Sequence, residues 1–153
     1  MIILDLDHTL ICAVYKPIPD STEIFSRENG LIVLERPHAH SFLERIRGEH
    51  DIIVYTSALA WYAKRITKHF GLTEYPLYSR SSCIRKRDHY QKSLSKIFVQ
   101  PSESIIIVDD SPQYWEASDL ETCTLLAPSR WMGMPEDSGL ISLSEDYAAL
   151  QKN

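Results

Sequence analysis

IILDLDHTL, residues 2–10, joins a short run of branched apolar side chains to two aspartates and a threonine. Similar apolar runs recur further along the chain, at Ile52–Tyr55, at residues 105–108 and at residues 122–126. Short apolar runs without polar alternation are typical of strands that are buried on both faces of a parallel sheet. The sequence therefore predicts a central parallel sheet, with Ile2–Leu4 as its first strand.

Helical patterns lie between these runs, each with apolar residues at three- or four-residue spacing. The first begins at Pro37, with Phe42, Leu43 and Ile46 facing inward. The second covers residues 59–70 and ends at Gly71, and its inward residues are Leu59, Ala63, Ile66 and Phe70. The third covers residues 90–99 with Leu94, Ile97 and Phe98 inward, and the fourth begins at Ser111-Pro112. Strands that alternate with helices predict an α/β fold with a doubly wound parallel sheet. Ligands bind to such folds outside the carboxyl ends of the strands.

Residues 15–34 interrupt the alternation of strands and helices. Asn29-Gly30 is a strong hairpin signal, so we expect a small β insertion here. The 153 residues fit one domain over residues 1–153, without room for a large cap over the site. We therefore expect an open cleft.

Composition narrows the range of partners. Lys and Arg number 16 against 21 Asp and Glu, for a net charge of −5, which argues against nucleic acid as a partner. Cys12, Cys83 and Cys123 form no CxxC pair, so neither a disulfide framework nor a zinc knuckle is indicated. The amino-terminal run is too short for a signal peptide or a membrane span. We expect a soluble intracellular monomer, in the cytoplasm or, in a eukaryote, the nucleus.

The polar residues after the predicted strands indicate a metal site. Asp5 and Asp7 follow the first strand two positions apart, so both side chains can reach one cleft. Carboxylates this close repel each other unless a cation intervenes, and Mg²⁺ binds such groups together with substrate phosphate. Asp110 could complete the site from a neighbouring strand.

The same residues could catalyse phosphoryl transfer. An aspartate can attack phosphorus in line, while a second acid protonates the leaving oxygen and later activates water. Thr56, with Ser57 beside it, offers a hydroxyl to the phosphoryl group, and Lys92 offers a positive charge. Each residue alone also fits a structural role, such as a turn cap, a strand-end hydroxyl or a solvated lysine, but their ordered combination favours chemistry.

DLDHTL (residues 5–10), VYTSA (54–58), Lys92 and VDDSP (108–112) together resemble the four ordered motifs of the haloacid dehalogenase superfamily. More narrowly, they resemble its carboxy-terminal-domain phosphatase branch, which is NLI-interacting-factor-like. Its members dephosphorylate serines in the RNA polymerase II tail and in other proteins. LERPHAHSFLERI and RSSCIRKRDHYQKSL resemble this branch between the motifs, and the similarity spans about residues 2–135.

The resemblance implies a role for each matched residue. Asp5 corresponds to the phosphoacceptor, Asp7 to the acid/base, Thr56 to the phosphoryl-binding hydroxyl, Lys92 to the charge-stabilising lysine and Arg80 to an arginine that contacts the phosphopeptide. The implied Mg²⁺ ligands are Asp110, the Asp5 carboxylate and the Asp7 main-chain carbonyl. Asp109 would lie next to these ligands without binding the ion itself. The implied substrate is a phosphoserine or phosphothreonine protein. The insertion gives no clear match to the aromatic pocket of the polymerase-tail enzymes, and Tyr15 and Phe25 are its candidates.

Several alternatives remain beside this interpretation. A phosphotyrosine protein phosphatase or a small-molecule phosphatase of the same fold would use the same residues. A phosphoacceptor receiver also uses Asp, Thr and Lys, but its acid pair comes on the first strand and its acceptor on a middle one. A silent phosphoprotein-binding module of this fold usually lacks a motif aspartate, and none is missing here.

Two further sequence features need an interpretation. The basic run at residues 85–87 fits either a solvated loop or a surface that steers an acidic or phosphorylated partner. His38 and His40 could suggest a metal, but without a third ligand nearby in the sequence we interpret them as a polar pair at a helix start.

Overall fold

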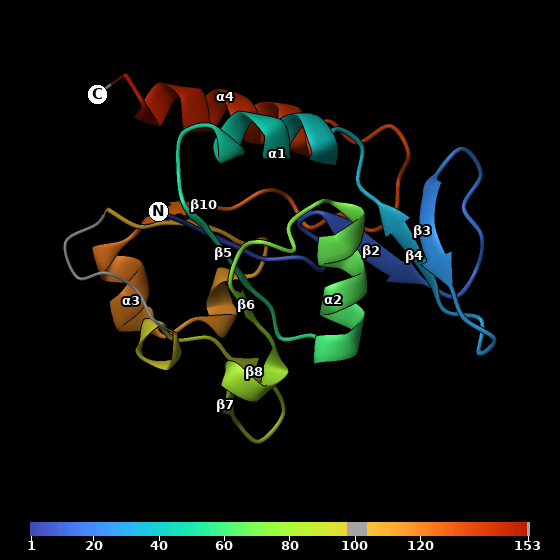
Figure 1. The fold of residues 1–153 in the computed structure, drawn as a ribbon, viewed down its shortest axis with the longest axis horizontal. Helices are drawn as coiled ribbons and strands as arrows, with labels where there is room; N and C mark the ends of the chain where they lie inside the picture. The colour runs from blue at the N-terminus through green and yellow to red at the C-terminus, as the bar shows by residue number, and fades with distance from the viewer. Residues whose placement is uncertain (98–103, 153) are drawn as a thin grey trace.

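A five-stranded parallel sheet forms the centre of the protein, in a computed structural model that describes residues 1–97 and 104–152 (Figure 1). The strand order is β10–β9–β1–β5–β6, in which the strands are β1 (Ile2–Leu4), β5 (Ile52–Tyr55), β6 (Leu77–Tyr78), β9 (Ile106–Val108) and β10 (Thr124–Leu126). The first two predicted strands are confirmed at their predicted bounds. β9 begins one residue later than predicted. β10 begins two residues later, because the chain is still helical at Thr122.

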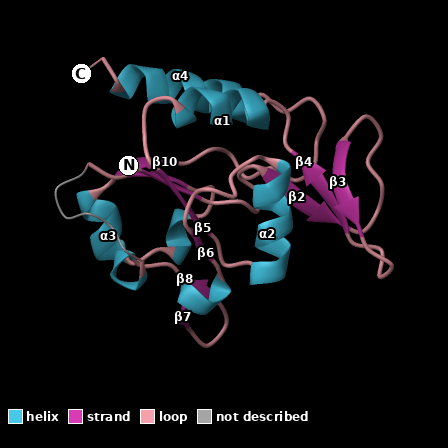
Figure 2. Cartoon of the chain, in the orientation of Figure 1, coloured by secondary structure: helices cyan, strands magenta, loops and turns pink. Residues whose placement is uncertain are grey.

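Side chains alternate across this sheet and build two apolar layers, as the period of two requires. Ile2 and Leu4 of β1 pack with α1 (Ala39–Arg47), α2 (Ala60–His69) and α4 (Gly139–Leu150). Ile3 faces the opposite layer, which includes Leu120 of α3 (Ala117–Thr122). Helices on both faces of a parallel sheet confirm the predicted doubly wound α/β architecture (Figure 2).

The first two predicted helices form with nearly the expected inward faces. In α1 the predicted Phe42, Leu43 and Ile46 are buried, together with Ala39. In α2 the predicted Ala63 and Ile66 are buried, and Phe70 follows at the C-cap, with Gly71 at φ 64° ending the helix as expected. Leu59 was wrongly expected inside: it precedes the first turn and is 46% exposed at the cleft.

The predicted helix over residues 90–99 is wrong. The chain instead forms β8 (Tyr90–Gln91), paired with β7 (Ile84–Arg85), and then a 3-10 turn, η2 (Leu94–Lys96). Tertiary pairing overrides the helical pattern here, because the Lys92 amide donates to the Tyr114 carbonyl and its carbonyl accepts from the Glu116 amide. Leu94 and Ile97 still pack into the core, whereas Phe98 and Val99 lie outside the described residues.

The predicted helix at Ser111-Pro112 is a single 3-10 turn, η3 (Pro112–Tyr114). The Ser111 hydroxyl does not cap it, since it donates to the Asp110 carboxylate instead. A further 3-10 turn, η1 (Arg80–Ser82), follows β6. Both turns place polar residues beside the strand ends rather than extending the helical layers.

The insertion forms a separate antiparallel sheet of β2 (Ile11–Val14), β3 (Thr22–Ser26) and β4 (Ile32–Glu35), in the order β2–β4–β3 (Figure 1). The predicted hairpin joins β3 to β4, with Gly30 at φ 83° and the Asn29 side chain accepting from the Leu31 amide. The sheet begins earlier than predicted, at Ile11, directly after the first motif. Among the described residues, no helix is both long and apolar enough to cross a membrane.

Candidate active site

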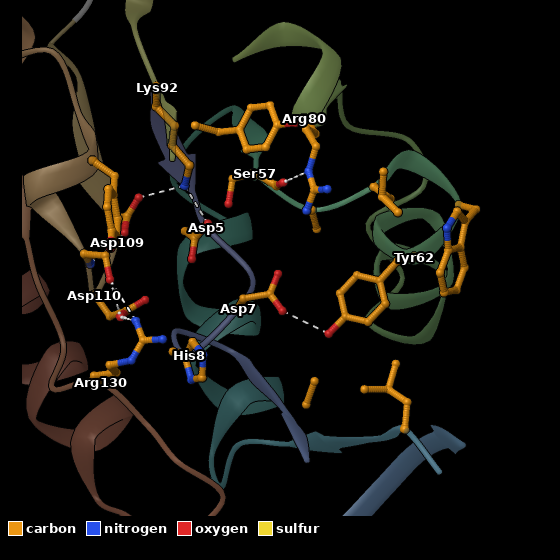
Figure 3. A pocket seen from close by; sticks show the side chains of 18 of the residues that line it. Asp5, Asp7, His8, Ser57, Tyr62, Arg80, Lys92, Asp109, Asp110 and Arg130 are labelled. Carbon is orange, nitrogen blue, oxygen red and sulfur yellow. Dashed lines mark hydrogen bonds and ion pairs between the residues drawn. The ribbon is translucent and has the colours of Figure 1, made fainter. Parts of the chain in front are cut away.

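The ends of adjacent parallel strands bring the predicted acids together. Leu4 pairs with Val108, so Asp5 and Asp7 after β1 lie beside Asp109 and Asp110 after β9. All four acids line a cleft of about 570 Å³ (Figure 3). The cleft is also lined by His8, Tyr15, Leu31, Ser57, Leu59, Trp61, Tyr62, Arg80, Tyr90, Lys92, Ser111 and Arg130.

Lys92 is buried between two of these carboxylates. Its Nζ donates to Asp5 Oδ1 at 2.5 Å and to Asp109 Oδ2 at 2.7 Å. Asp109 Oδ2 also accepts from Trp115 Nε1 at 2.7 Å, and its Oδ1 accepts from the Ser111 amide at 2.8 Å. Both oxygens of Asp109 therefore accept hydrogen bonds from the protein, one of them from Lys92, and its supporting role at the metal stays a prediction. Asp5 Oδ2 has no donor among the described residues and is free for chemistry.

The charges in this cluster do not balance. Burial opposes the charged form of Lys92, but Asp109 and Asp5 outweigh burial and raise the pKa of Lys92. Burial also works against ionised Asp109, yet the ammonium and the indole donor hold the pKa of that carboxyl below its usual range. Burial raises the pKa of Asp5 well above its usual range, despite Lys92. One ammonium thus faces two buried carboxylates, which leaves surplus negative charge.

Asp7 is held from the other side of the cleft. Tyr62 on α2 donates its hydroxyl to Asp7 Oδ1 at 2.9 Å (Figure 3). Burial raises the pKa of Asp7, and the Tyr62 hydrogen bond opposes that rise. A carboxyl with a raised pKa retains its proton more readily, which suits a general acid.

Asp110 has its own set of partners. Its Oδ1 accepts from the Thr9 hydroxyl at 3.2 Å, and its Oδ2 accepts from the Ser111 hydroxyl at 2.7 Å and from Arg130 Nη1 at 3.0 Å. The Asp110 amide in turn donates to Thr9 Oγ1 at 3.1 Å. Thr9 therefore fastens the first motif to the last one, and this explains the threonine at that position.

A tight turn carries the acids of the first motif. His8 adopts a left-handed conformation at φ 66°, and its Nδ1 lies 2.8 Å from the Trp131 carbonyl. The buried Arg36 donates through Nη1 to the Thr9 carbonyl at 3.1 Å. It also pairs through Nε with Asp137 Oδ2 at 2.7 Å. One guanidinium thus ties the turn to the segment before α4.

The residues after β5 take different positions. Thr56 is fully buried, its hydroxyl accepts from the Ala58 amide at 3.1 Å, and it does not line the cleft, so its phosphoryl-binding role stays a prediction. Ser57 does line the cleft, and its carbonyl accepts from Arg80 Nε at 2.7 Å. The Arg80 guanidinium also lies over the Tyr90 ring, 4.8 Å from its centroid. Arg80 is therefore held at the cleft wall (Figure 3).

The donor chemistry of this cluster fits a divalent cation. Carboxylate oxygens of Asp5, Asp109 and Asp110 all lie within 4.8 Å of one another. Hard cations prefer such oxygen ligands, and the raised pKa of Asp5 indicates negative charge that a cation would offset. Asp109 is less available as a ligand than Asp110, because its oxygens accept from the buried Lys92 ammonium, the Trp115 indole and the Ser111 amide, whereas one of the three donors to Asp110 is the half-exposed Arg130.

Sequence reasoning missed four residues of this site. They are Thr9, Arg36, Tyr62 and Arg130, each joined to a motif residue that is distant in the sequence. Thr9 was inside the quoted motif and could have been singled out. Tyr62 and Arg130 give no local signal, since their roles depend on where α2 and the segment after β10 lie. Of the two aromatic candidates, Tyr15 lines the cleft and is 70% exposed, whereas Phe25 is buried against Tyr62.

Known proteins share both sequence and fold with this chain. The human CTD small phosphatase-like protein is 34% identical over 119 residues, which are 72% of this chain and 42% of that protein. Phosphatase Herzog of Drosophila melanogaster is 31% identical over 118 residues, which are 72% of this chain and 33% of that protein. This chain thus spans less than half the length of either relative.

A solved structure of Fcp1, described as an essential RNA polymerase II CTD phosphatase, shares the fold. Its TM-score is 0.63 at 20% identity, and the match covers 99% of this chain and 48% of that one. The family model described as NLI interacting factor-like phosphatase matches residues 1–153. The chain therefore belongs to the NLI interacting factor-like phosphatase family, in the carboxy-terminal-domain phosphatase branch of the haloacid dehalogenase superfamily.

Proposed function

We propose that the protein is a Mg²⁺-dependent protein phosphatase that works through an aspartyl-phosphate at Asp5. The observation that carries the proposal is the Asp5 carboxylate, which has one oxygen fixed by Lys92 and the other free at the cleft. A nucleophile held in this way can approach a phosphoryl group in line without losing its orientation. The human and Drosophila relatives named phosphatases support the same activity.

The first step transfers the phosphoryl group to the protein. Asp5 Oδ2 forms a bond to phosphorus while the bond from phosphorus to the substrate oxygen breaks. Asp7 donates its proton to that oxygen, so the product leaves as a neutral alcohol. Lys92 places its charge beside the nucleophile, where it offsets the negative charge of the transferring group.

The second step regenerates the enzyme. Asp7, now ionised, takes a proton from a water molecule, and the water oxygen bonds to phosphorus as the bond to Asp5 breaks. Inorganic phosphate leaves and Asp5 is again a carboxylate. Tyr62 keeps Asp7 aimed into the cleft through both steps.

Asp5, Asp110 and the Asp7 main-chain carbonyl would hold the Mg²⁺ ion. The ion supplies positive charge that reduces repulsion between the Asp5 carboxylate and the phosphoryl oxygens. Arg130, which donates to Asp110 Oδ2, would compete with the ion for the Asp110 carboxylate.

The walls of the cleft favour a phosphate carried on a peptide. Tyr15 and Leu31 of the insertion face the cleft together with Leu59 and Trp61 from the start of α2. Tyr15, Leu59 and Trp61 are 70%, 46% and 43% exposed, respectively. Exposed apolar side chains beside a charged site suit a peptide that packs next to its phosphorylated residue. We propose phosphoserine and phosphothreonine proteins as the substrates.

Trapping of the phosphoenzyme tests the mechanism. The wild type, Asp5→Asn and Asp7→Asn are mixed with a radiolabelled phosphoserine peptide and Mg²⁺, and are then quenched in acid. We expect label on the wild type, none on Asp5→Asn, and hydroxylamine-sensitive label that persists longest on Asp7→Asn. Asp146→Asn, an exposed substitution on α4, is the matched control. Labelling of Asp5→Asn at the wild-type level would exclude Asp5 as the acceptor.

A substrate panel tests the specificity separately. Values of kcat/KM are compared for matched phosphoserine, phosphothreonine and phosphotyrosine peptides and for sugar and nucleotide phosphates. We expect the first two peptides to lead. A metabolite that exceeds every peptide by about tenfold would replace the protein-phosphatase proposal with a small-molecule one, because that ratio requires about 1.4 kcal/mol of extra transition-state binding.

A further inference from the structure

A second cluster of metal-ligating side chains lies outside the catalytic cleft. Glu35 at the end of β4, His40 in the first turn of α1 and His69 in the last turn of α2 converge there. Their ligand atoms all lie within 4.8 Å of one another. Glu35 Oε2 is 2.6 Å from His69 Nε2 and 3.3 Å from His40 Nε2. The sequence did not reveal the partners of His40. They are Glu35 of β4 and His69 of α2.

Packing fixes the directions of the two imidazoles. The His40 and His69 rings lie 5.6 Å apart between centroids, and each also contacts the Phe70 ring, at 5.2 Å and 4.9 Å. Phe70 is buried, so both rings rest on a rigid apolar base. Side chains held in this way lose little additional freedom when they bind a common ion.

The separation between the Glu35 and His40 ligand atoms suits a tetrahedral ion. Two atoms bound to zinc at about 2.0–2.1 Å in a tetrahedron are about 3.4 Å apart. The 3.3 Å between Glu35 Oε2 and His40 Nε2 matches this value, whereas the 2.6 Å hydrogen bond between Glu35 Oε2 and His69 Nε2 would have to lengthen by about 0.8 Å. Two histidines and one glutamate form a known zinc ligand set that leaves the fourth position to water.

We propose that Glu35, His40 and His69 form a binding site for Zn²⁺ or a similar borderline transition-metal ion. The nitrogen ligands separate it from the all-oxygen catalytic cluster, since Mg²⁺ prefers oxygen and leaves imidazole to zinc, copper or nickel. Partial exposure of the side chains, 52% for His40 and 30% for His69, leaves the ion a route from solvent.

The site would join three elements that surround the catalytic turn. An ion there would tie the start of α1 to the end of α2, which lie next to each other in Figure 1. Glu35 precedes Arg36, which holds the turn of the first motif, and α2 carries Tyr62, which holds Asp7. The bound ion therefore acts as a clamp on the scaffold and takes no part in the chemistry.

Equilibrium dialysis with Zn²⁺ tests the proposal, with excess Mg²⁺ present to occupy oxygen sites. The proteins are the full-chain wild type, His69→Gln, His40→Gln and Glu35→Gln, with His38→Asn as the matched control. His38 is an exposed neighbour on the same helix start, and its left-handed backbone at φ 68° tolerates asparagine. Circular dichroism of the metal-free variants establishes that each is folded.

We expect the wild type and His38→Asn to bind one equivalent of Zn²⁺ that the two histidine variants bind at least about tenfold more weakly. Zn²⁺ should also raise the melting temperature of the wild type and the control but not of His69→Gln. Co²⁺ in place of Zn²⁺ should give the visible absorption of a low-coordinate nitrogen and oxygen site. Equal Zn²⁺ binding by the wild type and the histidine variants would overturn the proposal, and so would the loss of this equivalent in His38→Asn.

Discussion

Asp5, the proposed nucleophile, shows at the scale of one residue how a buried charged group can oppose stability. Its carboxyl is buried, and its pKa lies well above the usual range of an aspartate, chiefly because burial disfavours the charged form. A group whose pKa rises on folding contributes stability below the unfolded pKa and loses it as the pH climbs through the folded value. Ionised Asp5 therefore costs folding free energy at neutral pH when no metal is bound.

Asp5→Asn should consequently abolish turnover and raise the melting temperature of the metal-free protein at neutral pH. The amide keeps an acceptor oxygen for Lys92 but carries no charge to bury. Each unit of pKa shift corresponds to about 1.4 kcal/mol, and each kcal/mol to ~2–4 °C in a chain of this size. Differential scanning calorimetry in EDTA measures the change. The gain should vanish below about pH 4, where the wild-type carboxyl is protonated in both states.

Tyr62 is a positioning residue, since its hydroxyl orients Asp7 and would not itself react with the substrate. Its hydroxyl donates to Asp7 and favours the charged carboxylate, so Tyr62→Phe should raise the pKa of Asp7 further. We expect the alkaline limb of the kcat/KM profile, where the general acid loses its proton, to move to higher pH. We also expect kcat to fall because the acid is less well aimed. An unmoved limb, measured on one phosphoserine peptide across the pH range, would show that Asp7 is not the acid.

Arg36 connects elements that the strand and helix pattern leaves separate. Its buried guanidinium joins the turn after β1 to Ser129 and Asp137, which lie between β10 and α4. A planar fork with five donors can make these contacts together, which a lysine ammonium could not do. Gly139 belongs to the same arrangement, because a Cβ there would collide with the Arg36 side chain.

Arg36→Met should therefore destabilise the protein by about 3–5 kcal/mol, the range for breaking a buried ion pair by removal of one partner. The methionine fills part of the volume but removes the guanidinium that donates to Asp137 and to the Thr9 carbonyl. Urea unfolding monitored by circular dichroism measures the loss. Glu136→Gln, at the exposed neighbour of Asp137, should stay within about 0.5 kcal/mol of the wild type. A similar loss in both variants would contradict this role for Arg36.

The elements also show where sequence reasoning succeeds. β1 and β5 were predicted at their observed bounds because buried parallel strands have a plain apolar signature. The segment around Lys92 was predicted as a helix, because its apolar spacing looks helical while its actual pairing with Trp115 depends on a distant part of the chain. The partners Tyr62 and Arg130 were missed for the same reason. Local pattern predicts the strand ends, and tertiary contacts decide what surrounds them.

Binding of a metal ion at the active site should affect the stability of the whole molecule. A cation that binds only the folded cluster of acids should stabilise the entire chain, by about 2.7 kcal/mol at a concentration one hundred times its Kd. We expect Mg²⁺ to raise the melting temperature of the wild type measurably, and EDTA to reverse the rise. Asp110→Asn should respond far less, because it loses a ligand that bridges the first and last motifs. An equal response in both proteins would place the ion elsewhere.

The position of β1 in the sheet has a consequence for how the chain reaches its native state. β1 precedes the other described strands in the chain, yet it is the central strand of its sheet, and Ile2 pairs with Ile52 on one side and with Ile106 on the other. Contacts so distant in the sequence give a high contact order. This slows folding, because the entropy of closing long loops is lost before the contacts between the strands stabilise the chain. During synthesis β1 therefore lacks one of its two neighbours until β9 has emerged, and in that interval its open edge is exposed to chaperones and to aggregation.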